Sequence, residues 1–268
     1  DVCGHIAAVG SDIDPGRLGD RVIVRNLMRA QCSNRPFECW TFGSECNGGF
    51  AQYTAVPSSE AYSIDSDMTD IELSSFSCAH STAENLLHRA HVKAGEHILV
   101  TGASGGVGSA VVQLAKCRGA YVTAVASFKK AAAVGKLGAD RVVLRDHELT
   151  FAIGQNTVDA VIDLVAGSGW QQQLEVLKRG GRYAVAGAIA GPFVELDLRT
   201  LYLKDLTFYG CTFQEEIVFE NLVRYIENRK IKPVIAKTYP LKKIVAAQQD
   251  FLEKQMFGKL VLIPPGDL

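Results

Sequence analysis

The stretch LVTGASGGVGSA, residues 99–110, holds the residues of this 268-residue chain whose types and spacing most clearly suggest chemistry. A short apolar run precedes its glycines and a helical pattern follows them, which is the setting of a loop that binds dinucleotide phosphates. Gly105 would let the main chain approach a pyrophosphate, and Gly108 would let the helix pack closely on the strand. Free amides at a helix N-terminus favour an anion. We therefore expect phosphate contacts from the loop residues Ser104, Gly105, Gly106, Val107 and Gly108.

The loop departs from the usual glycine pattern at one position and allows two other interpretations. Ala103 stands in the place of the first glycine, so the tight turn must tolerate a methyl group. A glycine-rich turn without a ligand is one alternative, but the further strand–helix units around the loop favour a cofactor. The other is the TGxxxGxG loop of short-chain dehydrogenases, which need a Tyr and a Lys four residues apart on one helix. Tyr239 and Lys243 have that spacing, but Pro240 belongs at a first helical position and leaves Tyr239 outside the helix.

The elements that must position the loop change in type along the chain. Residues 1–60 contain short apolar runs broken by Gly, Pro and Asp, and we expect strands in HIAAVG, DRVIVRN and GFAQYTAVP. Residues 69–91 have a helical pattern. From residue 97 onward strands alternate with helices, which predicts βαβ units and a parallel sheet. The tail after residue 220 has the pattern of helix, helix and strand.

The residues after the second strand of the alternating region indicate which dinucleotide the loop would hold. NAD-binding folds of this type place an acid about 20 residues beyond the loop, where it binds the ribose 2′-hydroxyl. Here the strand ends in VASFKK, which has no acid. Ser127 can donate a hydrogen bond, and Lys129 or Lys130 can pair with a phosphate. The sequence therefore predicts NADP(H), although the two lysines could also be a solvated helix start.

Over nearly its whole length the chain resembles the medium-chain dehydrogenase/reductase superfamily, which includes zinc alcohol dehydrogenases and quinone oxidoreductases. The stretches that carry the resemblance are VGSDIDPGRLGDRVIV, GGFAQYTAVP, STAENLLHRAHVKAGEHILVTGASGGVGSAVVQLAKCRGA, KLGADRVV, GGRYAVAG, LKDLTFYG and GKLVLIP. The resemblance implies an α/β chain: a doubly wound parallel Rossmann sheet inserted in a GroES-like, β-rich catalytic domain. We expect part of the catalytic domain in residues 1–80, the Rossmann domain in 81–213 and a return to the catalytic domain in 214–268. The resemblance also implies that an N-terminal part of the family's domain precedes Asp1.

The resemblance assigns further cofactor contacts. Ser127 and Lys130 fall where NADPH-using quinone reductases grip the 2′-phosphate. On the nicotinamide half it implies contacts from Thr82, Val165, Ala186, Gly187, Ala188, Cys211, Thr212 and Phe213. Apart from Thr82, each of these also has a core-packing interpretation.

The positions of the cysteines bear on whether the protein binds a catalytic or a structural zinc. By resemblance, Cys78 stands at the place of the last Cys ligand of a catalytic zinc, while the first Cys and the His would precede Asp1. A lone Cys is more often a small buried hydrophobe, so we expect no zinc. His80 could be a ligand or proton carrier, but a partly buried structural His is the simpler interpretation. A structural zinc needs four close cysteines, whereas only Cys32, Cys39 and Cys46 are present in that region.

These features together predict an NADP(H)-dependent oxidoreductase that passes hydride between the nicotinamide and a small carbonyl, quinone or enone. Tyr53 is the weak candidate for a proton donor. The alternatives are a zinc-dependent alcohol dehydrogenase on the same fold and a non-catalytic NADPH-binding protein. A net charge of −1 and the lack of a long apolar run give no sign of nucleic-acid or membrane partners. Seven cysteines without a CxxC pair suggest the cytoplasm, and the apolar stretch DLTFYGCTF suggests a homodimer.

Overall fold

The computed structural model describes residues 1–29, 37–253 and 255–266. Cys32, which the sequence analysis considered for a structural zinc, lies outside the described residues. The chain divides into two compact units, one of residues 1–81 and 213–268 and the other of residues 82–212. The second unit contains the glycine loop.

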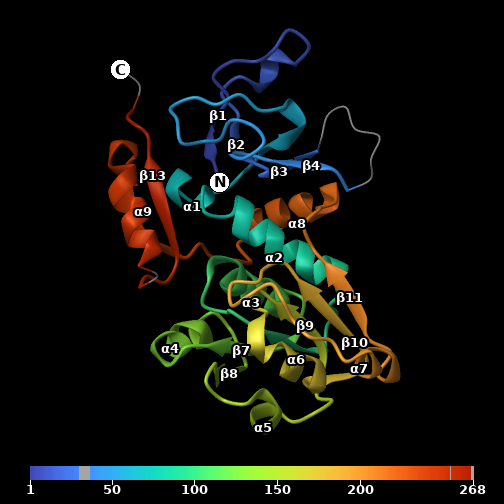
Figure 1. Cartoon of the computed structure of the whole chain (residues 1–268). Coiled ribbons are helices and arrows are strands. Elements are labelled where there is room, and N and C mark those ends of the chain that lie inside the picture. The colour runs from blue at the N-terminus through green and yellow to red at the C-terminus, as the bar shows by residue number, and fades with distance from the viewer. Residues whose placement is uncertain (30–36, 254, 267–268) are drawn as a thin grey trace. The chain divides into compact units, whose positions relative to one another are not determined.

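Unit 82–212 is built on a six-stranded sheet in the order β11-β10-β9-β6-β7-β8, with every neighbouring pair parallel (Figure 1). Its strands are β6 (His97–Val100), β7 (Tyr121–Ala126), β8 (Arg141–Leu144), β9 (Val158–Asp163), β10 (Leu177–Val185) and β11 (Thr207–Gly210). Numbered from β6, this is the 3-2-1-4-5-6 order of a Rossmann fold. The predicted doubly wound parallel sheet is therefore confirmed.

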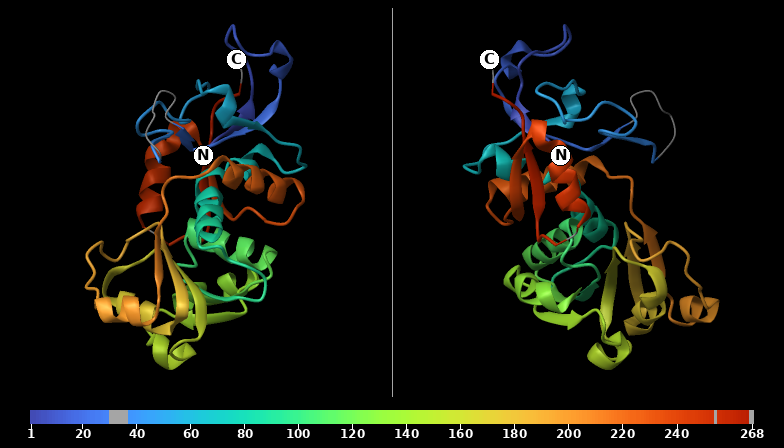
Figure 2. Two further views of the ribbon diagram at one scale, coloured as in Figure 1. Left: turned by 90° about the vertical axis from the view of Figure 1, so that its right-hand side faces the viewer. Right: turned by 60° about the vertical axis from the view of Figure 1, so that its left-hand side comes forward.

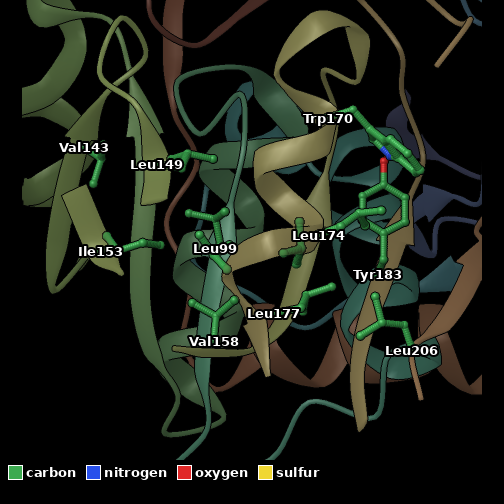
Figure 3. Close-up of a cluster of buried hydrophobic side chains, with 12 residues drawn as sticks. Leu99, Val143, Leu149, Ile153, Val158, Trp170, Leu174, Leu177, Tyr183 and Leu206 are labelled. Carbon is green, nitrogen blue, oxygen red and sulfur yellow. The ribbon is translucent and has the colours of Figure 1, made fainter. Parts of the chain in front are cut away.

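A helix lies in each connection between successive strands, and the C-terminal part of α2 (Ser77–Arg89) precedes β6. The helices of this unit are the C-terminal part of α2, α3 (Gly106–Cys117), α4 (Phe128–Lys136), α5 (Leu149–Ile153), the 3₁₀ turn Gly167–Gly169, α6 (Trp170–Val176) and α7 (Leu198–Leu203). The sheet buries side chains on both faces, as a parallel sheet must. Leu99 joins Leu149, Ile153 and Leu174 in the apolar cluster of Figure 3, which packs α5 and α6 on one face.

Unit 1–81 with 213–268 is richer in short strands. Its antiparallel sheet has the order β1-β2-β5, and two strand pairs, β3-β4 and β12-β13, stand apart from it. The strands are β1 (Cys3–His5), β2 (Arg21–Val24), β3 (Leu27–Arg29), β4 (Cys39–Thr41), β5 (Ala61–Ser63), β12 (Ile235–Pro240) and β13 (Lys259–Ile263). Its helices are the 3₁₀ turns Pro15–Arg17, Ser58–Glu60 and Leu241–Lys243, with α1 (Asp70–Leu73), the start of α2, α8 (Glu216–Glu227) and α9 (Ile244–Leu252).

Helix α9 lies against the β12–β13 pair, as the right-hand view of Figure 2 shows. The Tyr239 hydroxyl and the Lys237 ammonium both donate hydrogen bonds to Asp250 of α9. Tyr239 thus lies on a strand and outside the neighbouring helix, as the position of Pro240 predicts.

The structure corrects three local predictions in this unit. Residues 6–10 of HIAAVG and residues 50–57 of GFAQYTAVP form no strand. In the second run Phe50 and Tyr53 are exposed, so the apolar alternation does not face a core. The helix expected over 69–91 is broken between α1 and α2, and β12 lies where no strand was expected.

Candidate functional site

The parallel sheet brings most of the predicted cofactor residues to one edge. All six strands of unit 82–212 run in the same direction, so the segments that follow their carboxyl ends lie along the same side, where α/β proteins bind nucleotides. Those segments are residues 101–108 after β6, Ser127 after β7, Arg145 after β8, 164–167 after β9, 186–188 after β10 and 211–212 after β11.

The glycine loop makes its left-handed turn at Gly102, where φ is +58°. Ala103 is fully buried and has no positive φ, which explains why a methyl group is tolerated in the first-glycine place. Gly108 packs directly on this turn, because a β-carbon there would lie 2.7 Å from the Ala103 Cα. The loop therefore fits the close helix–strand contact that the sequence predicts for Gly108.

The amino end of α3 is open toward the outside of the loop. Gly105 caps the helix in an extended conformation, and no side chain makes the cap hydrogen bond. Gly105 and Gly106 are exposed, and no acid stands in the first turn. The first three amides of the helix have no carbonyl four residues earlier within it, and the helix dipole adds partial positive charge. This arrangement fits the pyrophosphate of a dinucleotide.

Positive charge gathers where β7 and β8 end. Ser127 caps α4 but makes no cap hydrogen bond through its hydroxyl, and the first turn of α4 contains no acid. Lys129 is exposed and Lys130 half-buried in that turn. The Arg145 N–H donates to the Ala126 carbonyl oxygen at 3.0 Å, which places Arg145 beside the chain entering Ser127.

Sequence reasoning missed Arg145, because the pairing of β8 with β7 brings it there. Among the described residues its ion pair is with its neighbour Asp146, at 3.5 Å between two exposed side chains, and such pairs contribute little. The arginine therefore keeps most of its capacity to bind an anion.

The segments after β9 and β10 lie against each other. A β-carbon on Gly187 would be 2.9 Å from the Leu164 carbonyl oxygen, and the Ala190 N–H donates to the Val165 carbonyl oxygen at 2.9 Å. Val165 is half-buried, while Ala186 and Ala188 are exposed. Small residues thus leave an open surface at this point of the edge.

The remaining predicted nicotinamide contacts lie in three different settings. Thr82 is half-buried in α2, and Thr212 is exposed after β11. Cys211 is buried, and burial raises the pKa of its thiol, which makes it a packing residue and not a nucleophile. Phe213 falls in the other unit, where its ring packs edge-on against Phe37 at 5.3 Å.

The proton-donor candidate Tyr53 is 67% exposed and lies on no strand, which corrects the expectation that a strand of the first unit carries it. Its role as a donor stays a prediction.

Cys78 lies in the first turn of α2 beside charged groups. Its N–H donates to the Asp1 carboxylate, which also pairs with the Lys259 ammonium at 2.5 Å. Burial lowers the pKa of Lys259 and lowers the pKa of His80 to about 3, so the imidazole is neutral at physiological pH.

The described residues around Cys78 do not by themselves form a zinc site. In residues 1–29, 37–253 and 255–266, no three His, Cys, Asp or Glu side chains gather as metal ligands. Cys78 and His80 are two residues apart on a helix and therefore project on different sides. A lysine ammonium near the thiol also opposes a divalent cation.

None of the described helices is both long enough and apolar enough to cross a bilayer.

Comparison with known proteins connects both units to one group of enzymes. The family model described as zinc-binding dehydrogenase matches residues 106–228, and the one described as alcohol dehydrogenase GroES-like domain matches residues 1–66. The GroES-like part of the fold prediction is thereby confirmed.

Individual relatives cover almost the whole chain. A quinone oxidoreductase from Pongo abelii is 27% identical over 98% of this chain and 78% of its own length. A solved structure assigned to an alcohol dehydrogenase from Sinorhizobium meliloti 1021 is 45% identical, with a TM-score of 0.92 over 98% of this chain and 74% of that one. A 2-octenoyl-CoA carboxylase reductase solved with NADP and 2-octenoyl-CoA is 25% identical, with a TM-score of 0.88 over 97% of this chain and 66% of that one.

Proposed function

Because the chain belongs to the medium-chain dehydrogenase/reductase superfamily of NAD(P)-binding oxidoreductases, we propose that it is an NADP(H)-dependent reductase of a small quinone, conjugated enone or carbonyl compound. We assign residues 82–212 as the dinucleotide-binding domain and residues 1–81 with 213–268 as the catalytic domain. The quinone oxidoreductase and the 2-octenoyl-CoA carboxylase reductase among the similar proteins support the substrate class.

The observation that carries the cofactor assignment is the charge at the ends of β7 and β8. Lys129, Lys130 and Arg145 stand near Ser127, and the first turn of α4 has no acid to repel a phosphate. An acid at this point would bind a ribose 2′-hydroxyl, whereas several cations and a hydroxyl suit a 2′-phosphate. NADP bound to the 2-octenoyl-CoA carboxylase reductase is consistent with this choice.

The cofactor supplies the hydride, and the protein binds and orients it. The α3 amides and Ser104 hold the pyrophosphate, while the segments around Val165 and Gly187 face the nicotinamide half. Tyr53 is the candidate proton donor, and Tyr53→Phe tests it: retained kcat would remove it from the reaction.

The proposed reaction uses no zinc, a choice supported by the Lys259 ammonium beside Cys78, which opposes a divalent cation. The zinc-dependent alcohol dehydrogenase is accordingly not favoured. We further propose a homodimer formed through the β11 edge, and a reducing compartment such as the cytoplasm, since the described cysteines form no disulfide.

The test compares cofactor affinity and turnover in one preparation. Titration of the native protein should give a lower Kd for NADPH than for NADH, and NADPH oxidation should follow addition of a quinone or an enone. Equal affinities would remove the NADP assignment. Tight NADPH binding without turnover of any quinone, enone or aldehyde would favour the non-catalytic binding protein.

A further inference from the structure

Asp163 ends β9 at the cofactor edge of the sheet and is fully buried, with its side chain surrounded by hydrogen-bond donors. The Thr101 hydroxyl, which follows β6, donates to Oδ1, and the Tyr183 hydroxyl of β10 donates to Oδ2, each at 2.5 Å. Asp163 therefore ties together the ends of three neighbouring strands. Neither it nor these two partners emerged from the sequence, because they lie far apart along the chain.

The same carboxylate also organises the turn that follows it. The Val165 N–H donates to Oδ1 at 2.9 Å, and the Ala166 N–H donates to both oxygens at 3.2 and 3.1 Å. The Leu164 N–H donates to the Thr101 hydroxyl oxygen at 3.0 Å. The Asp163–Thr101 pair thus accepts hydrogen bonds from three successive amides.

That turn has a backbone conformation that needs support. Ala166 has φ 52° and ψ −138°, a combination that side-chain-bearing residues rarely adopt, and Gly167 follows with φ +71°. Such a residue costs on the order of 1–3 kcal/mol and persists only where its surroundings hold it. Asp163 supplies the hydrogen bonds that do so.

The turn is also clamped between two loops of the cofactor edge. A β-carbon on Gly102 of the glycine loop would lie 3.1 Å from Val165 Cγ2, and one on Gly187 would lie 2.9 Å from the Leu164 carbonyl oxygen. A shift of the 164–167 turn would therefore change the surface beside both the pyrophosphate loop and residues 186–188.

The donors to Asp163 are all neutral. Among the ion pairs of the described residues none involves this carboxylate, so its charge is balanced by hydroxyls and amides alone. Trp170 extends the arrangement, since its indole nitrogen is directed at the Tyr183 hydroxyl in Figure 3 and hydrogen-bonds to it. A fully connected polar network of this kind fixes one geometry, because each member left without its partner would be costly.

We propose that Asp163 is a positioning residue: with Thr101 and Tyr183 it fixes the 164–167 turn so that Val165 forms the nicotinamide side of the cofactor site. The proposal rests on the proposed NAD(P) function and deepens it. Asp163 does not touch the reacting atoms. It acts through the amides of Val165 and Ala166.

The experiment separates the two halves of the cofactor. Adenosine 2′,5′-bisphosphate contains only the adenosine half, whereas NADPH also needs the nicotinamide pocket, and both affinities are measured by calorimetry. Asp163→Asn keeps the size of the side chain but turns one acceptor into a donor. We expect the Kd for NADPH to rise about tenfold, which is the effect of losing one charge-assisted hydrogen bond. The Kd for the bisphosphate should stay within about twofold of the native value, a smaller change than the loss of one ordinary hydrogen bond would cause.

A matched control lies on the same strand. Asp159, near the amino end of β9, accepts from the His97 N–H and pairs with Lys178 at 2.7 Å. Asp159→Asn should leave the ratio of the two affinities unchanged. A second pair keeps the test valid if Asp163→Asn fails to fold: Thr101→Val removes the hydroxyl, and Thr101→Ser retains it. Thr101→Val should raise the Kd for NADPH and alter the fluorescence of bound NADPH, and Thr101→Ser should restore both.

Each remaining outcome decides the question. If Asp163→Asn and Thr101→Val weaken both ligands equally, or resemble Asp159→Asn, the network is merely structural and the inference is wrong. If the native protein binds neither NADPH nor the bisphosphate, the proposed function itself fails.

Discussion

Gly108 of α3 lies against Gly102 of the preceding turn with no space for a side chain between them. A β-carbon on Gly108 would clash with the Gly102 carbonyl oxygen and would lie 2.7 Å from the Ala103 Cα. Both contacts are with backbone, which cannot move without opening the loop. At Gly105, three residues earlier, a β-carbon would meet only the Gly102 carbonyl oxygen, at 3.4 Å.

The two glycines therefore predict different variants. Gly108→Ala should lower the free energy of unfolding by about 1–3 kcal/mol through overpacking. Gly105→Ala, with φ −82° and an exposed position, should leave stability within about 0.5 kcal/mol but weaken NADPH binding by obstructing the phosphate. Urea unfolding and NADPH titration of both variants check this. Equal stability of the two would contradict the packing argument.

A second prediction concerns Lys130 in the first turn of α4. Lys130→Ala should weaken NADPH by roughly 1–3 kcal/mol, the range of a charge-assisted hydrogen bond, and leave NADH nearly unchanged because NADH has no 2′-phosphate. Lys136→Ala, in the last turn of the same helix, is the control with the same charge change. Similar losses for both variants would show a general charge effect.

The parallel sheet was predicted from the sequence and is confirmed, whereas the cofactor contacts of the glycine loop and of Ser127 and Lys130 stay predictions. All three features lie in short continuous stretches of the chain. Arg145 and Asp163 escaped prediction because strand pairing brings their partners together: Ala126 for the first, Thr101 and Tyr183 for the second. The false strand over 50–57 has the opposite cause. Its alternation is typical of a strand, but an apolar pattern alone does not supply a neighbouring strand or a core.

A third prediction follows from His97. Its Nδ1 lies 3.1 Å from the Thr157 carbonyl oxygen and its Nε2 2.8 Å from the Thr123 hydroxyl oxygen. A neutral ring that donates to the carbonyl can accept from the buried hydroxyl, whereas a protonated ring cannot. Burial is the main cause that lowers the pKa of His97 below the ordinary 6.5.

Protonation therefore favours the unfolded chain. The contribution of His97 to stability should be complete above pH 6.5 and decline as the pH falls below it. Urea midpoints measured between pH 7.5 and 5 should fall more steeply in the native protein than in His97→Gln. The exposed His147→Gln is the control and should follow the native curve. Identical curves for all three would refute the assignment.

A fourth prediction concerns the β11 edge. The Cys211 N–H donates toward β10, through the Val185 carbonyl oxygen, so by strand alternation the Gly210 N–H points away from β10. The unpaired edge could add the same strand from a second copy. We expect dimers in light scattering at micromolar concentration, loss of dimers in Gly210→Pro and their retention in Gly210→Ala. A β-carbon at Gly210 meets nothing within 4 Å, so Gly210→Ala does not crowd the chain. A monomeric native protein would refute the prediction.

The last prediction concerns Cys78, because it separates the two enzyme hypotheses. Without zinc, Cys78 is a half-buried side chain at the start of α2, and Cys78→Ala should cost on the order of 1 kcal/mol of stability, the low end of core truncations. Turnover with a quinone or an enone should survive, and metal analysis of the native protein should find no stoichiometric zinc. If the thiolate were one of three protein ligands of a catalytic zinc, its loss would abolish metal retention and turnover together.

The ion pair between Asp1 and Lys259 next to Cys78 favours the outcome without zinc, since it places an ammonium where a zinc site would need further anionic or neutral donors. One zinc per chain that is lost in Cys78→Ala would move the function to a zinc-dependent alcohol dehydrogenase.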